Sequence, residues 1–391
     1  MNRIKKLFFV TLIFFIFWGT TLSYGMGRRF YSDSEDMRWI IPYYAEELTY
    51  NLFDWELKHG ELCTGKFLGN KILRFNLSRC SFLFRLPDFK ICKNLKDLNL
   101  SYCVNLRDIL ALTEIQSLRW VNFQECRSLW NIRPIGSLEN LEILNLDGCE
   151  SIRDFSILIR LTNLKSLGLC STGIESLDYL KELIKLNRLA LCHCFALKDF
   201  TALSGLVGLK VLFLNDCQYL ELLPDLSNLT QLQFLSLADC ESLTDISGVS
   251  GLISLESLNL SGCSCLCDIS PIRGITGLKI LNLSWCNRIK NMSVVSDLTG
   301  LEELNFSGCL GLSSSNFPAL SRCKSLKKLD IRYTYFAEGI SNVLLKNAAE
   351  NFSHDDVVRL LMAIDERDSG VLETKHKRAR VLDKNLSVLC D

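Results

Sequence analysis

The chain has 391 residues, 48% of which are apolar, and its 44 basic residues balance its 44 acidic residues to leave no formal net charge. So high an apolar content excludes an intrinsically disordered chain and predicts a large buried core. The charge balance argues against a nucleic-acid-binding protein, whose surface carries a basic excess, so we expect no nucleic-acid partner.

The N-terminal segment, 1–25, has the pattern of a cleavable secretory signal peptide. Three basic residues, Arg3, Lys5 and Lys6, precede an apolar run from Leu7 to Trp18, and small and polar residues follow. This run is shorter than the roughly 20 apolar residues of a membrane span. We therefore expect residues 1–25 to direct the chain into the secretory pathway, with a secreted or cell-surface location. The alternative is an uncleaved signal anchor, which would be the chain's one contact with a membrane.

Residues 26–71 are rich in aromatic side chains, among them Trp39, Phe53 and Trp55. They precede a long repeat, and the first unit of any repeat array has an apolar end that must be covered. We predict that this segment folds as an N-terminal cap.

A repeat of 23 residues with the pattern LxxLxL fills most of the remaining chain. Its length changes only in the fifth unit, which has 22 residues, and in the eleventh, which has 25. The fourth and sixth positions of every unit are apolar. The twelve units begin at Ile72, Leu95, Leu118, Leu141, Leu164, Leu186, Leu209, Leu232, Leu255, Leu278, Leu301 and Leu326. Such regular repetition predicts one solenoid domain over residues 72–336.

The clearest units read LKDLNLSYCVNLRDI, LEILNLDGCESIRDF and LQFLSLADCESLTDI, a pattern that resembles the leucine-rich repeat family. The resemblance implies an α/β fold, a leucine-rich repeat solenoid that curves as a right-handed superhelix. Each unit would add one short strand to a parallel concave sheet and an irregular turn to the convex side. The residue pattern supports this independently, because LxL buries one face of a strand and a lone unit cannot cover that face.

An aspartate at position fourteen recurs just before the convex part of the unit. A short carboxylate there can accept backbone N–H groups and start a turn. The segments that follow are too short for α-helices, so we expect 3₁₀ or single-turn helices. The aspartates are Asp108, Asp154, Asp199, Asp245 and Asp268.

The C-terminal part of the chain changes character after the last unit. Residues 337–368 have helical spacing, and Ser353 followed by Asp356 resembles a capping box, so we predict a C-terminal helical cap. Residues 369–391 include a basic run and are expected to form a flexible, solvated tail.

Ten of the eighteen cysteines share position nine of the unit. The resemblance implies that this position points inward at the bend after the strand, where a small donor bonds to a loop carbonyl. Thr172 and Thr334 replace cysteine in the other two units. We expect a structural ladder of reduced thiols because each rung needs its donor for its own loop, although neighbouring rungs are close enough for disulfides. The ladder consists of Cys80, Cys103, Cys126, Cys149, Cys194, Cys217, Cys240, Cys263, Cys286 and Cys309.

Two close groups of potential metal ligands arise within the repeats. One is Cys263 with Cys265 and Cys267, and the other is the run from Cys192 to Cys194 with a histidine between. Zinc sites favour C-x₂₋₄-C spacing and four ligands, whereas alternate residues around a bend point in different directions. We expect neither a metal nor another cofactor.

The concave face is the predicted ligand-binding surface. Positions three, five and seven of each strand should point toward solvent, and an asparagine run at position five is interrupted in units five to eight. Apolar and aromatic side chains gather around this interruption, as a binding surface requires. The alternative is drift of the repeat on a solvated sheet. The predicted binding residues are Trp120, Ile143, His193, Val211, Phe213, Phe234 and Trp285.

Five asparagines of the same column also lie in N-[LF]-S glycosylation sequons. Glycans added during secretion would crowd both ends of the concave face and leave its middle free. The repeat itself explains these sequons without any glycan, so the glycoprotein is an expectation only. The five are Asn76, Asn99, Asn259, Asn282 and Asn305.

No catalytic motif is present, and the four histidines are scattered along the chain. We predict a non-enzymatic binding protein, exported or surface-associated, that recognises a protein or a glycan on its concave face. The alternative is an intracellular or membrane-anchored adaptor or inhibitor, similar to the leucine-rich repeat proteins that select substrates for ubiquitin ligases. The cysteine ladder favours this alternative, because oxidising compartments normally pair cysteines.

Overall fold

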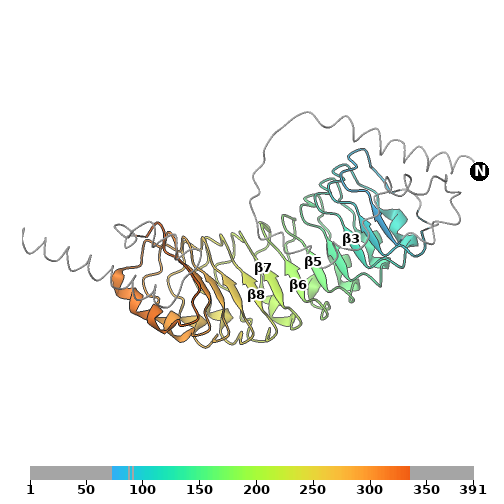
Figure 1. Cartoon of the computed structure of the whole chain (residues 1–391). Coiled ribbons are helices and arrows are strands. Elements are labelled where there is room, and N and C mark those ends of the chain that lie inside the picture. The colour runs from blue at the N-terminus through green and yellow to red at the C-terminus, as the bar shows by residue number, and fades with distance from the viewer. Residues whose placement is uncertain (1–72, 87–88, 90–91, 335–391) are drawn as a thin grey trace, which may run out of the picture.

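The computed structural model describes residues 73–86, 89 and 92–334, which form a curved array of repeated coils (Figure 1). Twelve parallel strands make one sheet in chain order. The predicted signal peptide, both caps and the tail lie outside the described residues. The strands are β1 (Arg74–Asn76), β2 (Asp97–Asn99), β3 (Trp120–Asn122), β4 (Ile143–Asn145), β5 (Ser166–Gly168), β6 (Arg188–Ala190), β7 (Val211–Phe213), β8 (Phe234–Ser236), β9 (Ser257–Asn259), β10 (Ile280–Asn282), β11 (Glu303–Asn305) and β12 (Lys328–Asp330).

The register of the sheet follows the repeat length. Each strand pairs with the next at an offset of one repeat unit, as in Arg74 with Asp97. The offset becomes shorter between β5 and β6, where Ser166 pairs with Arg188, and longer between β11 and β12, where Glu303 pairs with Lys328. These are the two places where the repeat length itself changes. The predicted leucine-rich repeat solenoid is confirmed.

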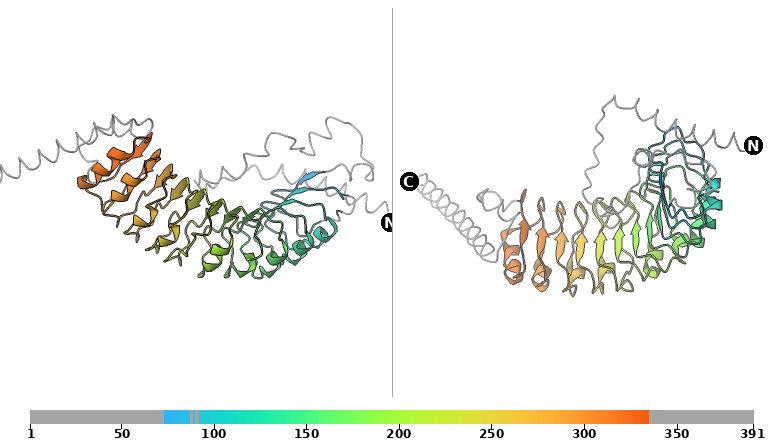
Figure 2. Two further views of the ribbon diagram at one scale, coloured as in Figure 1. Left: turned by 90° about the horizontal axis from the view of Figure 1, so that it is seen from below. Right: turned by 45° about the vertical axis from the view of Figure 1, so that its right-hand side comes forward.

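Short 3₁₀ helices follow the strands on the opposite, convex side, and Figure 2 shows the strands and helices on separate faces of the arc. The five predicted aspartates start them as expected: Asp268 Oδ1, for example, accepts the Ser270 N–H at 2.8 Å. The helices are η2 (Leu110–Glu114), η3 (Arg133–Ser137), η4 (Ser156–Arg160), η5 (Asp178–Leu180), η6 (Thr201–Gly205), η7 (Ser247–Val249), η8 (Ser270–Ile272), η9 (Ser293–Asp297) and η10 (Ser314–Arg322).

Unit seven has an extended convex segment in place of a helix. Its sequence L-P-D contains Pro224, which drives the preceding Leu223 toward an extended conformation. The Leu223 N–H donates to the Asp245 carbonyl and the Leu226 N–H to the Gly248 carbonyl, both at 3.0 Å. This backbone of unit seven therefore packs directly against that of unit eight.

The cysteine ladder lies in the core, and its bonding differs from the prediction. Nine of the ten thiols donate to a carbonyl of the preceding unit at 2.9–3.4 Å, as Cys103 does to Leu77. The prediction that each thiol bonds within its own loop is wrong, because the inward-pointing thiol reaches across to the neighbouring turn. The Leu100 carbonyl, for example, accepts the backbone N–H of Cys103 from its own unit and the thiol of Cys126 from the next unit. The ladder consequently ties each unit to the one before it.

Threonine at position nine behaves differently from cysteine. Thr172 Oγ1 donates to the Leu169 carbonyl and Thr334 Oγ1 to the Ile331 carbonyl, both within the same unit and at 2.6 Å. The boundary between units four and five therefore lacks the ladder bond, as does the boundary between units eleven and twelve.

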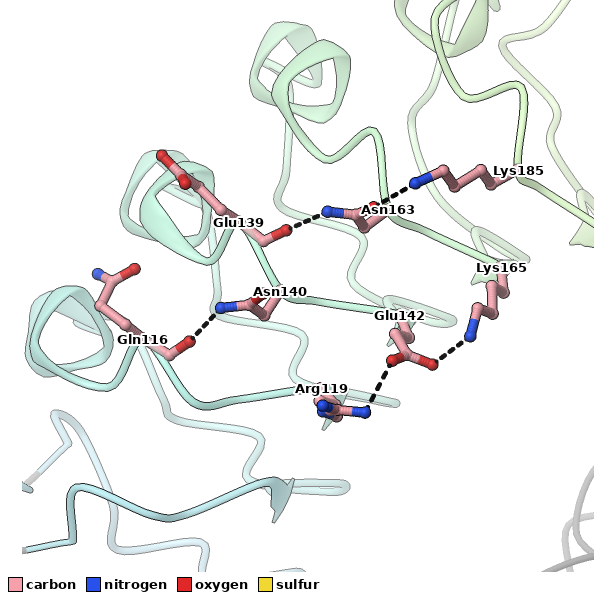
Figure 3. Close-up of polar contacts among 8 residues, drawn as sticks. All are labelled: Gln116, Arg119, Glu139, Asn140, Glu142, Asn163, Lys165 and Lys185. Carbon is pink, nitrogen blue, oxygen red and sulfur yellow. Dashed lines mark hydrogen bonds and ion pairs between the residues drawn. The ribbon is translucent and has the colours of Figure 1, made fainter.

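The edge at which the strands begin carries a second set of links between units (Figure 3). Asn140 Nδ2 donates to the Gln116 carbonyl at 3.0 Å, and Asn163 Nδ2 donates to the Glu139 carbonyl at 2.8 Å. Lys185 Nζ extends the row by donating to Asn163 Oδ1 at 2.7 Å. These amides satisfy carbonyls between stacked turns, so their role is structural.

Ion pairs run parallel to this row of amides. Glu142 contacts Arg119 at 3.2 Å and Lys165 at 2.6 Å (Figure 3). All three side chains are partly exposed, and such pairs contribute about 1 kcal/mol or less.

Candidate functional site

On the concave face, the side chains at position five cap the C-terminal ends of the strands. In eight of the twelve units the position-five side chain accepts the backbone N–H two residues later, at 2.7–3.1 Å; Asn99 Oδ1 accepts from Ser101 in this way. The five sequon asparagines belong to this set. Their amide oxygens are thus engaged in the fold, and glycosylation stays a prediction.

Where the column is interrupted, side chains at position seven take over this role. Asp147 Oδ1 accepts the Cys170 N–H of the next unit at 2.7 Å. Cys170 Sγ in turn accepts the Cys192 N–H at 3.3 Å. The first of these bonds spans the boundary between units four and five, at which the ladder bond is missing.

A second apolar cluster, separate from the main core, occupies the concave face at this interruption. Its buried members are Cys170, Ala190, Cys192 and Phe213, and the half-buried Val211 and Phe234 pack against them. We call this group the concave cluster. The Phe213 and Phe234 rings lie 4.9 Å apart, and the Arg188 guanidinium lies 5.5 Å from the Phe213 ring, as in a cation–π contact.

Four of the seven predicted binding residues share position three of their strands. They are half-buried side chains of β3, β4, β7 and β8, namely Trp120, Ile143, Val211 and Phe234. Phe213, at position five, is only 6% exposed and forms the floor beneath its neighbours. Arg188, which the sequence analysis did not single out, lies at position three of β6 between the two groups. Its charge sets it apart from the apolar side chains that the sequence pattern indicates.

The other two predicted residues, His193 and Trp285, lie on the rim just beyond the strands. His193 Nδ1 is 2.8 Å from Asp216 Oδ2 of the next unit. Trp285 stacks on Tyr333, with ring centroids 6.0 Å apart, and both rings are exposed. Between them lies Gly308, where a Cβ would be 2.6 Å from the Trp285 ring. The seven residues therefore form a concave group and two separate rim positions.

The backbone at position eight has a left-handed conformation in every unit, which the sequence analysis did not predict. The φ angles lie between 52° and 74°, and nine of the twelve residues are not glycine. Left-handed backbone favours glycine, asparagine and aspartate, but this column also contains arginine, glutamate and aromatic residues. The twelve residues are Arg79, Tyr102, Glu125, Gly148, Ser171, His193, Asp216, Asp239, Gly262, Trp285, Gly308 and Tyr333.

Asp147 is the one buried carboxylate among the described residues, with 5% of its surface exposed. Burial raises the pKa of its carboxyl group, and nearby Glu125 adds to this effect. The Cys170 N–H and the Asn145 side chain lower the pKa but do not offset burial. The Asp147 carboxyl group therefore binds its proton more tightly in the folded protein than in the unfolded chain.

This difference predicts how Asp147 affects stability with pH. As pH rises from about 4 through the raised pKa, ionisation of Asp147 should lower the free energy of unfolding. We expect Asp147→Asn to keep an acceptor for the Cys170 N–H and to remove this decline, so that the variant gains stability relative to wild type between pH 4.5 and 7.5. Urea unfolding of both proteins at the two pH values measures the difference.

Asp225→Asn serves as the matched control. Asp225 is exposed, and the Ser227 N–H holds the pKa of its carboxyl group below the usual value. Its contribution to stability is lost only as pH falls below about 4, so the difference in unfolding free energy between this variant and wild type should be nearly the same at pH 4.5 and 7.5. A gain of the same size in both variants would contradict the assignment.

Within 73–86, 89 and 92–334, no group of three or more histidine, cysteine or acidic side chains is arranged to hold a metal ion. A shallow hollow of about 690 Å³ lies near the strand-start edge and has a polar lining without a catalytic grouping. It is lined by Gln116, Gly136, Ser137, Glu139, Arg160, Thr162 and Asn163. In the part of the chain that the structure describes, no helix has the length and apolar character to cross a membrane.

Solved structures of several repeat proteins are similar to the chain. An internalin (InlF) from Listeria monocytogenes has 19% identity and a TM-score of 0.49, with 68% of this chain and 82% of that chain covered. The functional domain of InlJ from the same organism, described as including a cysteine ladder, has 20% identity and a TM-score of 0.48, covering 72% and 58%. The leucine-rich repeat ectodomain of an Arabidopsis thaliana receptor kinase, in complex with Casparian strip integrity factor 2, has 18% identity and a TM-score of 0.45, covering 64% and 37%.

Two family models match parts of the repeat region, whereas no curated protein matches the chain. Residues 85–198 match a model described as a BspA type leucine rich repeat region of six copies. Residues 230–274 match a model of two leucine rich repeats. Together with the twelve-unit repeat and its parallel register, these matches identify the chain as a leucine-rich repeat protein.

Proposed function

We propose that this chain is an exported, non-enzymatic binding protein that docks a protein ligand on the concave face over β3 to β8. The observation that carries the proposal is the concave cluster. Replacing the missing asparagine caps requires only an acceptor at position seven, such as Asp147 or Cys170. That requirement does not explain why Val211 and Phe234 add apolar surface at position three.

The contact surface would be the position-three row of these strands, which we call the concave patch. It consists of Trp120, Ile143, Ser166, Arg188, Val211 and Phe234, all half-buried. Tryptophan and arginine are typical energetic anchors of protein interfaces. Six strands at about 4.8 Å spacing give a patch roughly 24 Å long, enough for an extended segment of about seven residues.

A protein ligand suits this patch better than a glycan does. Apolar side chains and one guanidinium can bury the apolar side chains of a partner and pair with a carboxylate. A glycan presents many hydroxyl groups, and the patch has few polar side chains to bond them. Phe213 beneath the patch would keep Val211 and Phe234 in fixed positions, which lowers the entropic cost of binding.

Export is proposed on the pattern of residues 1–25, and the cysteine ladder is compatible with it. The ladder thiols are buried and donate to carbonyls, so they are protected from the oxidants of a secretory compartment. Burial raises the pKa of Cys126 and Cys194 to about 12, which keeps these thiols protonated and unreactive. N-terminal sequencing of protein recovered from the medium tests export; an intact Met1 in the cytosol would contradict it.

Binding is tested with the full chain as an affinity bait against extracellular proteins, followed by dissociation constants for each captured partner. We expect Val211→Ala combined with Phe234→Ala to weaken binding at least tenfold, which corresponds to about 1.4 kcal/mol. The control combines Leu110→Ala with Ile159→Ala, which removes exposed apolar side chains from convex helices η2 and η4. Equal affinity of the concave variant and wild type, or equal loss in both variants, would contradict the proposal.

A further inference from the structure

Cys170 and Cys192 are the only described cysteines that lie in the concave cluster. They occupy position seven of units five and six, directly across from each other. The pairing of Gly168 with Ala190 continues past the strands, because the Leu169 N–H donates to Ala190 at 2.9 Å and the Ser171 N–H donates to Cys192 at 2.8 Å. Side chains at equivalent positions of adjacent parallel strands point the same way.

This placement satisfies the geometry of a disulfide. Neighbouring strands hold equivalent Cα atoms about 4.8 Å apart, within the range of roughly 4.4–6.8 Å found in disulfides. The Cys192 N–H already lies 3.3 Å from Cys170 Sγ. A bond between the two sulfurs therefore requires rotation of the side chains and little movement of the backbone.

The ladder thiols are committed elsewhere. Each of nine ladder thiols donates to a carbonyl of the preceding unit, and Cys194, two residues from Cys192, donates to Leu169 at 3.3 Å. Oxidising a ladder thiol would leave a buried carbonyl without that donor. In the bonds described for Cys170 and Cys192, the two sulfurs face each other, and Cys170 Sγ accepts a backbone N–H. Neither thiol donates to a carbonyl in these bonds, so oxidation of this pair leaves no carbonyl without its donor.

The two thiols also differ in acidity. A hydrogen bond from the Cys170 thiol, assisted by the Asn215 N–H, lowers the pKa of Cys192 against the opposing effect of burial. The same interaction and burial raise the pKa of Cys170. Cys192 is thus the thiol that ionises first, and a thiolate is the nucleophile of disulfide exchange.

We propose that Cys170 and Cys192 are a redox site that forms a reversible cross-strand disulfide by exchange with a low-molecular-weight disulfide. The Cys192 thiolate attacks one sulfur of that disulfide, whose S–S bond breaks and releases one small thiol. Cys170 then loses its proton and attacks Cys192 Sγ in the mixed disulfide, releasing the second small thiol. The two protein thiols are oxidised, the small disulfide is reduced, and the two protons end on the two small thiols.

The site is independent of the binding function proposed above, because it concerns only the chemistry of the two sulfurs. The two cysteines are only 7% and 8% exposed, so a small disulfide reaches them only through the concave face. Bridging units five and six would add a covalent link between neighbouring turns next to the boundary between units four and five, which lacks a ladder bond.

The test incubates the folded full chain with oxidised glutathione, blocks free thiols with iodoacetamide under denaturing conditions and maps tryptic peptides without reductant. We expect a cross-link between the peptide of residues 166–181, which contains Cys170, and that of residues 189–198, which contains Cys192 and Cys194. It should be lost on reduction, and the ladder cysteines should be recovered alkylated.

Single variants show which sulfurs react. Cys192→Ser and Cys170→Ser should abolish the cross-link. Cys194→Thr should retain it, and threonine is tolerated at position nine in units five and twelve. Two free thiols after oxidation, a mixed glutathione disulfide that persists on Cys192, or a cross-link lost only in the Cys194 variant would each overturn the proposal.

Discussion

Replacement of Gly248 by alanine is expected to lower the free energy of unfolding by about 3 kcal/mol. Gly248 is buried in η7, where the extended backbone of unit seven packs against it. A Cβ there would lie 2.7 Å from the Leu223 carbonyl oxygen and still closer to that of Pro224. Because both obstacles are backbone atoms, the methyl group can fit only if two turns of the solenoid separate. Urea unfolding followed by circular dichroism measures the loss.

Gly205 provides the matched control for this substitution. It ends the 3₁₀ helix η6, and apart from its chain neighbours and the backbone of that helix, no atom lies within 4 Å of the position that a Cβ would take. Gly205→Ala should leave stability unchanged or raise it by about 0.5 kcal/mol, because alanine restricts the unfolded chain. Equal effects of the two substitutions would show that close backbone packing in unit seven is not the cause.

Phe213→Ala is expected to lower the free energy of unfolding by about 3 kcal/mol, an effect typical of a core phenylalanine although this residue lies on the concave face. Its ring is in contact with Phe234 and Arg188 and is packed among small side chains of units five and six. Truncation would remove these contacts and leave a cavity beneath the concave patch. Thermal and urea unfolding of the full chain measure the change.

Two further variants separate packing from the loss of any aromatic ring. Phe195 is 49% exposed on the rim of unit six, so Phe195→Ala should change stability by no more than about 0.5 kcal/mol. Phe213→Leu keeps much of the buried volume and should cost about half as much as Phe213→Ala. A Phe213→Ala variant as stable as Phe195→Ala would mean that the concave cluster contributes nothing to the fold.

The strand register could be predicted from the sequence because each residue in a solenoid contacts mainly the equivalent residue of the next unit. Unit length then converts directly into strand offset, including the shorter step at Ser166 and the longer step at Glu303. The aspartate turns were predictable for a related reason. Asp268 and Ser270 are two residues apart, so their bond depends on local chain geometry alone.

The acceptors of the cysteine thiols could not be predicted in the same way. The acceptor of the Cys103 thiol is the Leu77 carbonyl of the preceding unit, so it depends on how neighbouring turns stack in the folded array. Phe213 presents a similar difficulty. Strand alternation places position five toward solvent, but the small Ala190 beside it on β6 leaves room for the ring to lie against the sheet.

The left-handed residue at position eight has a consequence for how this protein can change. A side chain other than glycine in this conformation costs about 1 kcal/mol, and nine units carry one. Substitution by glycine would relieve the local strain, but it would also remove partners such as His193 for Asp216 and Tyr333 for Trp285. At this rim, a glycine would favour the stability of the backbone, whereas a larger side chain gives the surface a group that can make contacts. Nine of the twelve units have the larger side chain.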